Sequence, residues 1–204
     1  MDLNELPTLL YHKFKYVITL LDDCSSYAVL IKLRRKSDAF QAFKDYKSWA
    51  EKQSGRKIKK IHIDRGGEFL NEITELFLKA EGIEVQKSEP HVHQQNGCTE
   101  HINHTLMDKS ESMRQHTCCL ESWWEFSYST AMHVYNRTPM CRLNWKTPTE
   151  IFTRRKPDVS YFRTFGAGAY VFIPKGQCKS KQSAHSEAMI FIEYDQGSKG
   201  YIFM

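Results

Sequence analysis

The chain has 204 residues, of which 41% are hydrophobic and 13% aromatic, and it carries a formal net charge of +5. This length allows one substantial domain, or one domain with a small module, and the composition argues against a disordered chain. The sequence contains no run of about 20 apolar residues and does not begin with a signal peptide, so we expect no membrane span. The mild positive charge permits an anionic partner such as nucleic acid without requiring one.

Strands and helices alternate along the first two thirds of the sequence. Residues 14–23 form a compact apolar run rich in β-branched residues, and residues 27–34 predict its hairpin partner. Apolar residues at helical spacing then predict a helix that begins near Ser37 and ends at Gly55. The next expected elements are a strand, a helix, a strand and two helices, over residues 57–64, 71–82, 83–88, 97–114 and 121–138.

This alternation predicts an α/β fold in which helices flank a mixed sheet. From Phe165 onward the pattern changes to short strands without helices between them, which predicts a separate small β module. We therefore expect a leader or linker, an α/β core, a connecting segment and a truncated β module, over residues 1–13, 14–138, 139–162 and 163–204.

Three acids stand at the ends of predicted elements. Asp22 ends the first strand, Asp64 ends the strand over residues 57–64, and Glu100 lies at the start of a helix, with 35 residues between Asp64 and Glu100. If these carboxylates meet at one point, their hard oxygen atoms suit Mg²⁺ or Mn²⁺. Two such ions would activate an attacking oxygen and stabilise a leaving oxygen in phosphoryl transfer. For any single acid, the alternative is that strands end at the surface, where acids are common.

Together these segments resemble the integrase of copia-type retrotransposons, whose core carries three acids. The stretches "YVITLLDDCSSYAVLIKL", "HIDRGGEF" and "HVHQQNGCTEHINHTL" are similar to the segments of the first, second and third acid. The segments "SWWEFSYSTAMHVYNRTP" and "SEAMIFIEYDQGSKGYIF" are similar to the region of that polyprotein downstream of the third acid. The resemblance implies an RNase H-like fold with an SH3-like β module, and the joining of the 3′ ends of element cDNA to target DNA. It gives Asp22, Asp64 and Glu100 the catalytic and metal-binding roles, with Mg²⁺ or Mn²⁺ as cofactor.

Amide side chains gather just before Glu100, in the segment that the resemblance identifies as a DNA-contacting loop. Such amides can donate hydrogen bonds to phosphates or base edges, a glycine permits the turn into the helix, and the helix start adds partial positive charge. A solvated turn is the alternative. The expected nucleic-acid contacts are Gln94, Gln95, Asn96, Gly97, Asn103 and His104. The resemblance also implies a homo-oligomer when active and a nuclear location, with the cytoplasm otherwise, and RNA is a second candidate partner.

The sequence departs from the family's pattern at four positions. His93 stands where proline is usual, and His101 and His104 stand where arginine is usual. Because histidine is mostly neutral at pH 7 while arginine stays charged, we expect weakened DNA binding. Each lost phosphate contact would lower the salt dependence by about 0.9 in slope. Glu193 replaces a glycine of the β module, and we expect its side chain to strain the strand.

Three other functions remain open. The first is a decayed or co-opted fragment that keeps the fold and binds DNA or RNA without catalysis. The second is an RNase H-type nuclease, which shares the fold and the metal chemistry. The third is zinc binding by the cluster of histidines and one cysteine around Glu100, whose spacing matches no closed zinc pattern. That cluster comprises His91, His93, Cys98, His101 and His104.

Overall fold

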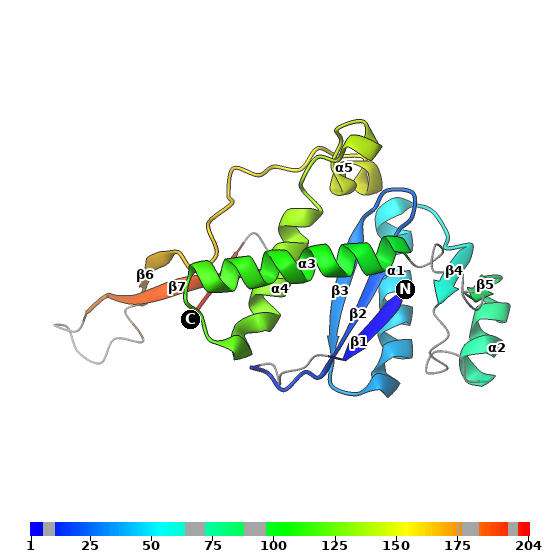
Figure 1. Ribbon diagram of the computed structural model, residues 1–204, viewed down its shortest axis with the longest axis horizontal. Coiled ribbons are helices and arrows are strands. Elements are labelled where there is room, and N and C mark those ends of the chain that lie inside the picture. Colours follow the sequence, from blue (N-terminus) through cyan, green and yellow to red (C-terminus); the bar gives the residue numbers. More distant parts are fainter. Residues whose placement is uncertain (6–10, 64–71, 88–96, 175, 177–183, 196–199) are drawn as a thin grey trace.

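The computed structural model describes residues 1–5, 11–63, 72–87, 97–174, 176, 184–195 and 200–204 (Figure 1). Its elements are β1 (Asp2–Glu5), β2 (Tyr16–Leu21), β3 (Ala28–Leu33), α1 (Ala39–Ser54), β4 (Lys60–Ile63), α2 (Glu72–Ala80), β5 (Glu84–Lys87), α3 (Gly97–His116), α4 (Trp124–Tyr135), α5 (Pro148–Thr153), β6 (Gly168–Phe172), β7 (Ser186–Tyr194) and β8 (Tyr201–Phe203). The expected α/β fold is confirmed. Within the described ranges, no helix combines the length and the apolar character that a bilayer crossing needs.

An antiparallel sheet in the order β1-β2-β3 forms the centre of the molecule. β2 and β3 are the expected hairpin, because their apolar residues alternate over the two faces of the sheet. β1 was not expected. Residues 2–5 lie in the stretch that we assigned to a leader, but they pair with β2 and place Asp2 opposite Thr19. The first residues are therefore part of the core sheet.

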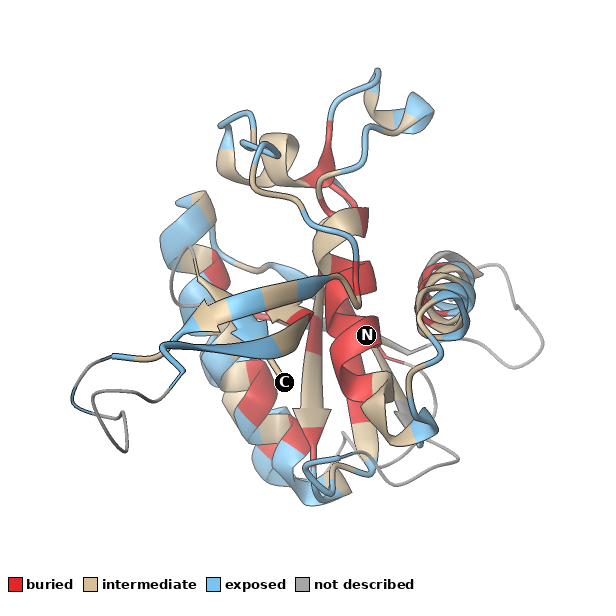
Figure 2. Cartoon of the chain, turned by 90° about the vertical axis from the view of Figure 1, so that its left-hand side faces the viewer, coloured by how far each residue is buried: buried red, intermediate tan, exposed pale blue. Residues whose placement is uncertain are grey.

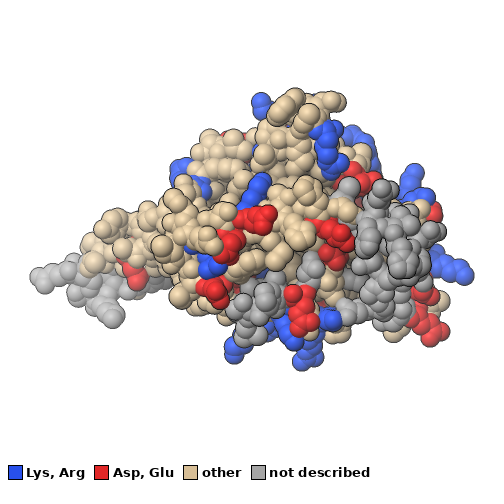
Figure 3. Space-filling model, in the orientation of Figure 1, with Lys and Arg blue, Asp and Glu red and all other residues tan. Residues whose placement is uncertain are grey.

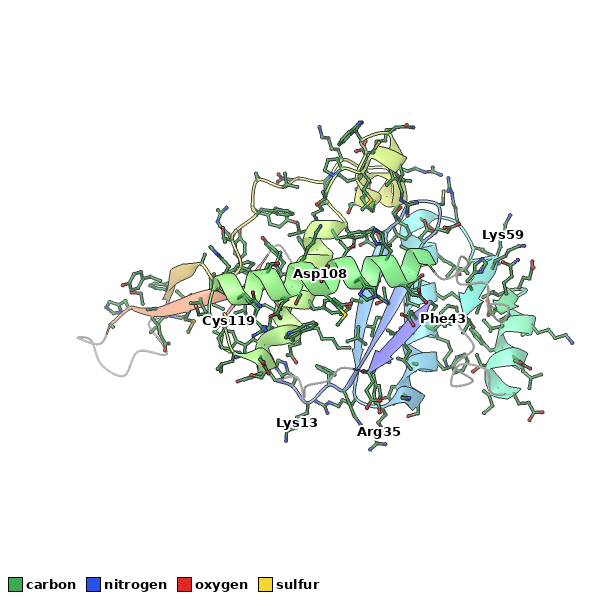
Figure 4. The ribbon with its side chains drawn as sticks, in the orientation of Figure 1. Lys13, Arg35, Phe43, Lys59, Asp108 and Cys119 are labelled. Carbon is green, nitrogen blue, oxygen red and sulfur yellow. The ribbon has the colours of Figure 1, made fainter. Side chains whose placement is uncertain are left out.

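The two faces of this sheet carry different helices (Figure 1). Ile18 and Leu20 of β2 pack on the face that α1 covers, where they share a core with Phe43, which Figure 4 labels. Val17 lies on the opposite face and shares a core with Leu106 of α3 and with residues of α4. Because side chains alternate along a strand, even-numbered residues of β2 face α1 and odd-numbered residues face α3 and α4.

A parallel pair of strands, β4 and β5, extends the core on the side of β1, and α2 connects them (Figure 1). Ile63 and Leu78 are almost fully buried and belong to the same core as Ile18. Gly82 ends the α2 segment with a φ of +67°, in the left-handed region that glycine adopts without strain. The amino nitrogen of Met1 donates a hydrogen bond to the carbonyl of His62 over 3.0 Å, so the start of β1 lies against β4.

The C-terminal strands β6, β7 and β8 form a second antiparallel sheet, as expected. This sheet is packed against the α/β core. The hydroxyl of Thr130 on α4 donates to the carbonyl of Ile192 on β7 over 3.0 Å, and Phe126 and Phe165 complete a shared apolar cluster. As a result α4 is buried along most of its length (Figure 2).

Glu193 lies on β7 at a shift in the register between β7 and β8. Its side chain is 12% exposed, and its carboxylate lies 3.5 Å from the Lys32 ammonium group. Burial raises the pKa of this carboxyl group above its ordinary value of 4.5, and the charge of Lys32 opposes that effect. The side chain that we expected to strain the strand therefore joins the β module to the edge of the core sheet.

Candidate active site

Asp22 follows β2 and closes the turn into β3. Its carboxylate accepts a hydrogen bond from the backbone N–H of Ser25 over 2.8 Å, and a second one from the Ser25 hydroxyl. The alternation along β2 directs Asp22 to the α1 face, like Leu20. The electrostatics agree, because burial and then the charge of Asp22 raise the pKa of Tyr46 on α1. Asp22 thus acts in the structure as a turn residue on the α1 face.

Glu100 lies in the first turn of α3, as expected, and its side chain is exposed. Ile102 and Leu106, one to two turns further along this helix, pack on the face of the sheet opposite α1. The two acids are therefore carried by opposite faces. This placement does not favour the expected convergence of Asp22 with Glu100.

Asp2 lies on the same face of the sheet as Glu100. Directly paired residues of antiparallel strands point to one side, so Asp2 faces α3 and α4 together with its partner Thr19. The Asn103 amide nitrogen donates a hydrogen bond to the Asp2 carboxylate over 2.7 Å, and Asn103 follows Glu100 by one helical turn. The pKa of Tyr128 on α4 rises to about 12, mainly through burial and further through the charge of Asp2. The carboxylate of Asp2, a residue that we assigned to a leader, therefore lies beside the start of α3.

The strand that leads to Asp64 ends at the same place. Met1 bonds to the carbonyl of His62, two residues before Asp64, and Asp64 itself lies outside the described residues. The start of β1 thus contacts both β4 and the first turns of α3. In the part of the chain that the structure describes, no three His, Cys, Asp or Glu side chains form a metal-binding group.

The donor atoms at this place fit a hard divalent cation. Asp2 and Glu100 offer carboxylate oxygens, the ligand type that Mg²⁺ and Mn²⁺ prefer. The Asn103 side-chain oxygen is buried beside Asp2 and has no hydrogen-bond partner within the described ranges. Such an unpaired buried oxygen is costly unless water or an ion completes its shell. Asp2 and Glu100 are therefore the described residues that could hold the metal, with Asp64 as the third expected ligand.

The expected nucleic-acid contacts differ in their placement. Gln94, Gln95 and Asn96 lie outside the described residues. Gly97 begins α3 without a positive φ, and a Cβ there would meet nothing within 4 Å, so neither strain nor crowding requires a glycine. His104 is exposed on α3, whereas Asn103 is 5% exposed and bonded to Asp2, which gives it a positioning role.

The alternative of zinc binding gains no support from the described residues. His101 and His104 are exposed on α3, while His91 and His93 lie outside those residues and the Cys98 side chain is not described.

On the face that carries α3, the coloured Lys, Arg, Asp and Glu side chains are interspersed and form no continuous basic surface (Figure 3).

Asp2 could not be predicted as a site residue because the sequence around it has too weak a strand pattern. The segment "DLNE" contains a single apolar residue, Leu3, and one apolar residue is too short an alternating pattern to predict a strand. The available signal was Leu3 between Asp2 and Asn4, a single apolar residue that packs in the structure against the α1 core.

Comparison with known proteins finds similarity to integrases and to retrotransposon Pol polyproteins. Residues 1–93 match the family described as integrase core domain. The chain is 32% identical over 187 residues to the Retrovirus-related Pol polyprotein from transposon TNT 1-94 of Nicotiana tabacum, a match that covers 92% of this chain and 14% of that polyprotein. The chain thus spans about a seventh of the length of this curated relative.

Two solved structures share the fold. One is the HTLV-2 integrase catalytic core domain in complex with magnesium, in a trimeric form, at 16% identity and a TM-score of 0.54, covering 74% of this chain and 92% of that chain. The other is the simian T-cell lymphotropic virus intasome in complex with the PP2A regulatory subunit B56 gamma, at 14% identity and a TM-score of 0.58. That match covers 99% of this chain and 74% of the other.

Proposed function

We propose that the chain is a metal-dependent polynucleotidyl transferase of the integrase type, because residues 1–93 match the integrase core domain and the chain is similar to a retrotransposon Pol polyprotein. The single observation that supports a site for this chemistry is the hydrogen bond from Asn103 of α3 to the Asp2 carboxylate, next to Met1, which is bonded to β4. Asp2, Asp64 and Glu100 are the three acids of the proposed site, and Asp2 takes the place that the sequence analysis gave to Asp22.

These three acids would hold Mg²⁺ or Mn²⁺. When bound, such ions increase the nucleophilicity of an attacking oxygen and stabilise negative charge on a leaving oxygen. Magnesium in the HTLV-2 integrase core supports this choice of metal. The hydrogen bond from Asn103 fixes the orientation of the Asp2 carboxylate, so the acid is positioned before any substrate binds.

The proposed substrates are the ends of element cDNA and a target DNA. In the first step, water attacks phosphorus near the cDNA end, and the bond to the departing nucleotide breaks to leave a 3′-hydroxyl group. In the second step, this hydroxyl attacks a target phosphodiester in line, and the displaced target 3′-oxygen leaves. Gln94, Gln95, Asn96 and His104 are the proposed DNA contacts, and the partial positive charge at the start of α3 favours a phosphate there.

The assembly and location of the active form are also proposals. The trimeric core and the intasome among the similar structures support a homo-oligomer that holds DNA. A nuclear location follows from the proposed reaction on chromosomal DNA. RNA is the second candidate nucleic acid.

A second candidate function is nucleic-acid binding without catalysis. It is favoured by His101 and His104, which are exposed on α3 where the resembling family has arginine, and by the interspersed charges on that face (Figure 3). Weak contacts to phosphate would lower the residence time of DNA on the site.

A DNA-joining assay with Mn²⁺ separates the two functions. The wild-type chain and Asp64→Asn are incubated with labelled cDNA-end oligonucleotides and plasmid, and circular dichroism verifies that both are folded. We expect joined product from the wild type and a decrease of at least 100-fold in the variant. Equal activity of the two proteins, or no product from either while DNA still binds, would contradict the catalytic proposal.

A further inference from the structure

A groove with a volume of about 830 Å³ runs along the outer edge of β3, on the side of the sheet away from the proposed active site. Its floor is formed by residues 27–32, which are the residue before β3 and most of the strand, and its walls include Trp49 of α1 and Met132 of α4. β3 is the last strand of its sheet, so one row of its backbone N–H and C=O groups faces this groove.

Hydrogen bonds at the start of β3 determine which of its residues direct their backbone groups into the groove. Asp22, which follows β2, donates its N–H to the carbonyl of Tyr27 over 2.9 Å, so Tyr27 faces β2 and Ala28 faces away from it. With strand alternation, Val29 and Ile31 then face β2, while Leu30 and Lys32 direct their backbone groups into the groove. Within the described ranges, no hydrogen bond from outside the β2–β3 ladder is made to the main chain of Leu30 or Lys32.

Asn136 shows how this edge accepts a partner. Its side-chain amide donates to the carbonyl of Ala28 over 2.7 Å and accepts from the N–H of Ala28 over 3.0 Å. This pair of bonds is the one that a residue of a neighbouring strand would make. The amide therefore occupies the first position of the edge and leaves the next two positions, Leu30 and Lys32, to another partner.

From this arrangement we infer that the edge of β3 binds an extended peptide segment of a partner protein, which adds a fourth strand to the sheet inside the groove. Because α1 and α4 flank the edge of β3 on both sides, the groove favours an extended peptide over a second folded copy of the chain. Addition of a strand to a sheet edge is a general mode of peptide recognition in which main-chain bonds give affinity and wall pockets give specificity.

The side chains of the groove define the peptide that fits. Met132 and the ring of His133 form an apolar wall, since burial lowers the pKa of His133 to about 3 and leaves the ring neutral. Basic and acidic side chains both line the groove, with Arg137, Arg155 and Lys156 on the side of Asn136 and α5, and with Asp45, Asp158, Glu193 and Asp195 among the other lining residues. The partner segment thus has apolar residues at its centre, and an acidic residue at one end would meet Arg137, which follows the Asn136 that is bonded to Ala28.

Two pentapeptides with acetylated and amidated ends, EVIVT and TVIVE, serve as probes because they place the acid at either end and so allow parallel or antiparallel pairing. Binding to the whole chain is followed by NMR. We expect one of them to bind and to slow hydrogen exchange at the amides of Leu30 and Lys32 at least tenfold, with little change at Val29 and Ile31.

A matched pair of variants tests the edge itself. Lys32→Pro removes the outward N–H without removing a bond to β2, and Lys32→Ala removes the same side chain but keeps the N–H. We expect Lys32→Pro to weaken peptide binding about tenfold relative to Lys32→Ala. Should Lys32→Pro fail to fold, the same loss is expected when wild type is given a peptide N-methylated at the pairing positions.

Equal binding of the two variants, together with unchanged binding of the N-methylated peptide, would overturn the inference. Failure of both peptides to bind would also overturn it. A concentration-dependent dimer that Lys32→Pro abolishes and Lys32→Ala retains would overturn it as well, because the occupant of the groove would then be a second copy of the chain. These results are independent of DNA joining and leave the proposed function untouched.

Discussion

The side-chain amide of Asn103 donates a hydrogen bond to the carboxylate of Asp2 over 2.7 Å, and this contact joins the first strand of the sheet to the first turns of α3. Asp2 is thus bonded to a residue that follows Glu100 by one helical turn. Asp22, which closes a turn on the opposite face, has no comparable contact with α3 in the described ranges.

Asp2→Asn and Asp22→Asn separate the two candidate acids. Both substitutions remove one carboxylate charge with little change of shape. We expect Asp2→Asn to reduce DNA joining at least 100-fold and to abolish the increase in Tm caused by Mn²⁺, because ligand binding to the folded state alone stabilises it. Asp22→Asn should keep both. Loss of the Mn²⁺ effect in Asp22→Asn, with its retention in Asp2→Asn, would restore the assignment made from the sequence.

Asn103→Ala tests the positioning of Asp2. It removes a buried hydrogen bond to a charged group, so we expect the free energy of unfolding to fall by about 1–2 kcal/mol in chemical denaturation. Asn103→Asp is the matched comparison, since it keeps the shape but sets a second carboxylate against Asp2. That variant should lose more stability than Asn103→Ala, because it adds the repulsion of two like charges to the loss of the hydrogen bond. Equal losses of stability in the two variants would contradict the contact.

The double substitution His101→Arg and His104→Arg tests whether these histidines weaken DNA binding, as we expect. Each substitution adds a permanent charge to an exposed position in the first turns of α3. If both arginines contact phosphate, the slope of log K against log salt should steepen by about 1.8, which is about 0.9 for each contact. His116→Arg adds the same charge at the far end of the helix and should leave the slope nearly unchanged. Equal slopes for the two proteins would exclude a DNA surface at the start of α3.

His133 predicts a loss of stability in acid. Burial and the charge of Arg137 lower its pKa from 6.5 to about 3, and its ring stacks on Tyr194 with centroids 4.2 Å apart. The unfolded chain binds the proton more readily, so this contribution is fully present above pH 6.5 and is lost as the pH falls toward 3. Thermal unfolding should show a smaller decrease in Tm over this window for His133→Phe, which keeps an aromatic ring and cannot titrate. Parallel curves would contradict the assignment.

Elements with a local pattern could be predicted from the amino-acid sequence. Apolar residues at helical or alternating spacing predicted α1 to α4 and β2 to β8, and Gly55 and Gly82 were found at the ends of α1 and α2, each with a positive φ. The position of Glu100 at a helix start followed in the same way. These features depend on residues within one or two turns of each other, which is why a single sequence contains them.

The acids that share a face could be identified only in the folded chain. β1 has too few apolar residues to form alone, and its pairing with β2 brings Asp2 to α3. The alternation that predicts β2 also gives Asp22 a face, but which helix covers that face depends on packing between distant segments. Hydrophobic periodicity predicts which residues are buried, whereas the helix or strand that covers them depends on the packing of the whole core. For the same reason the edge of β3 and its contact with Asn136 emerge only from tertiary packing.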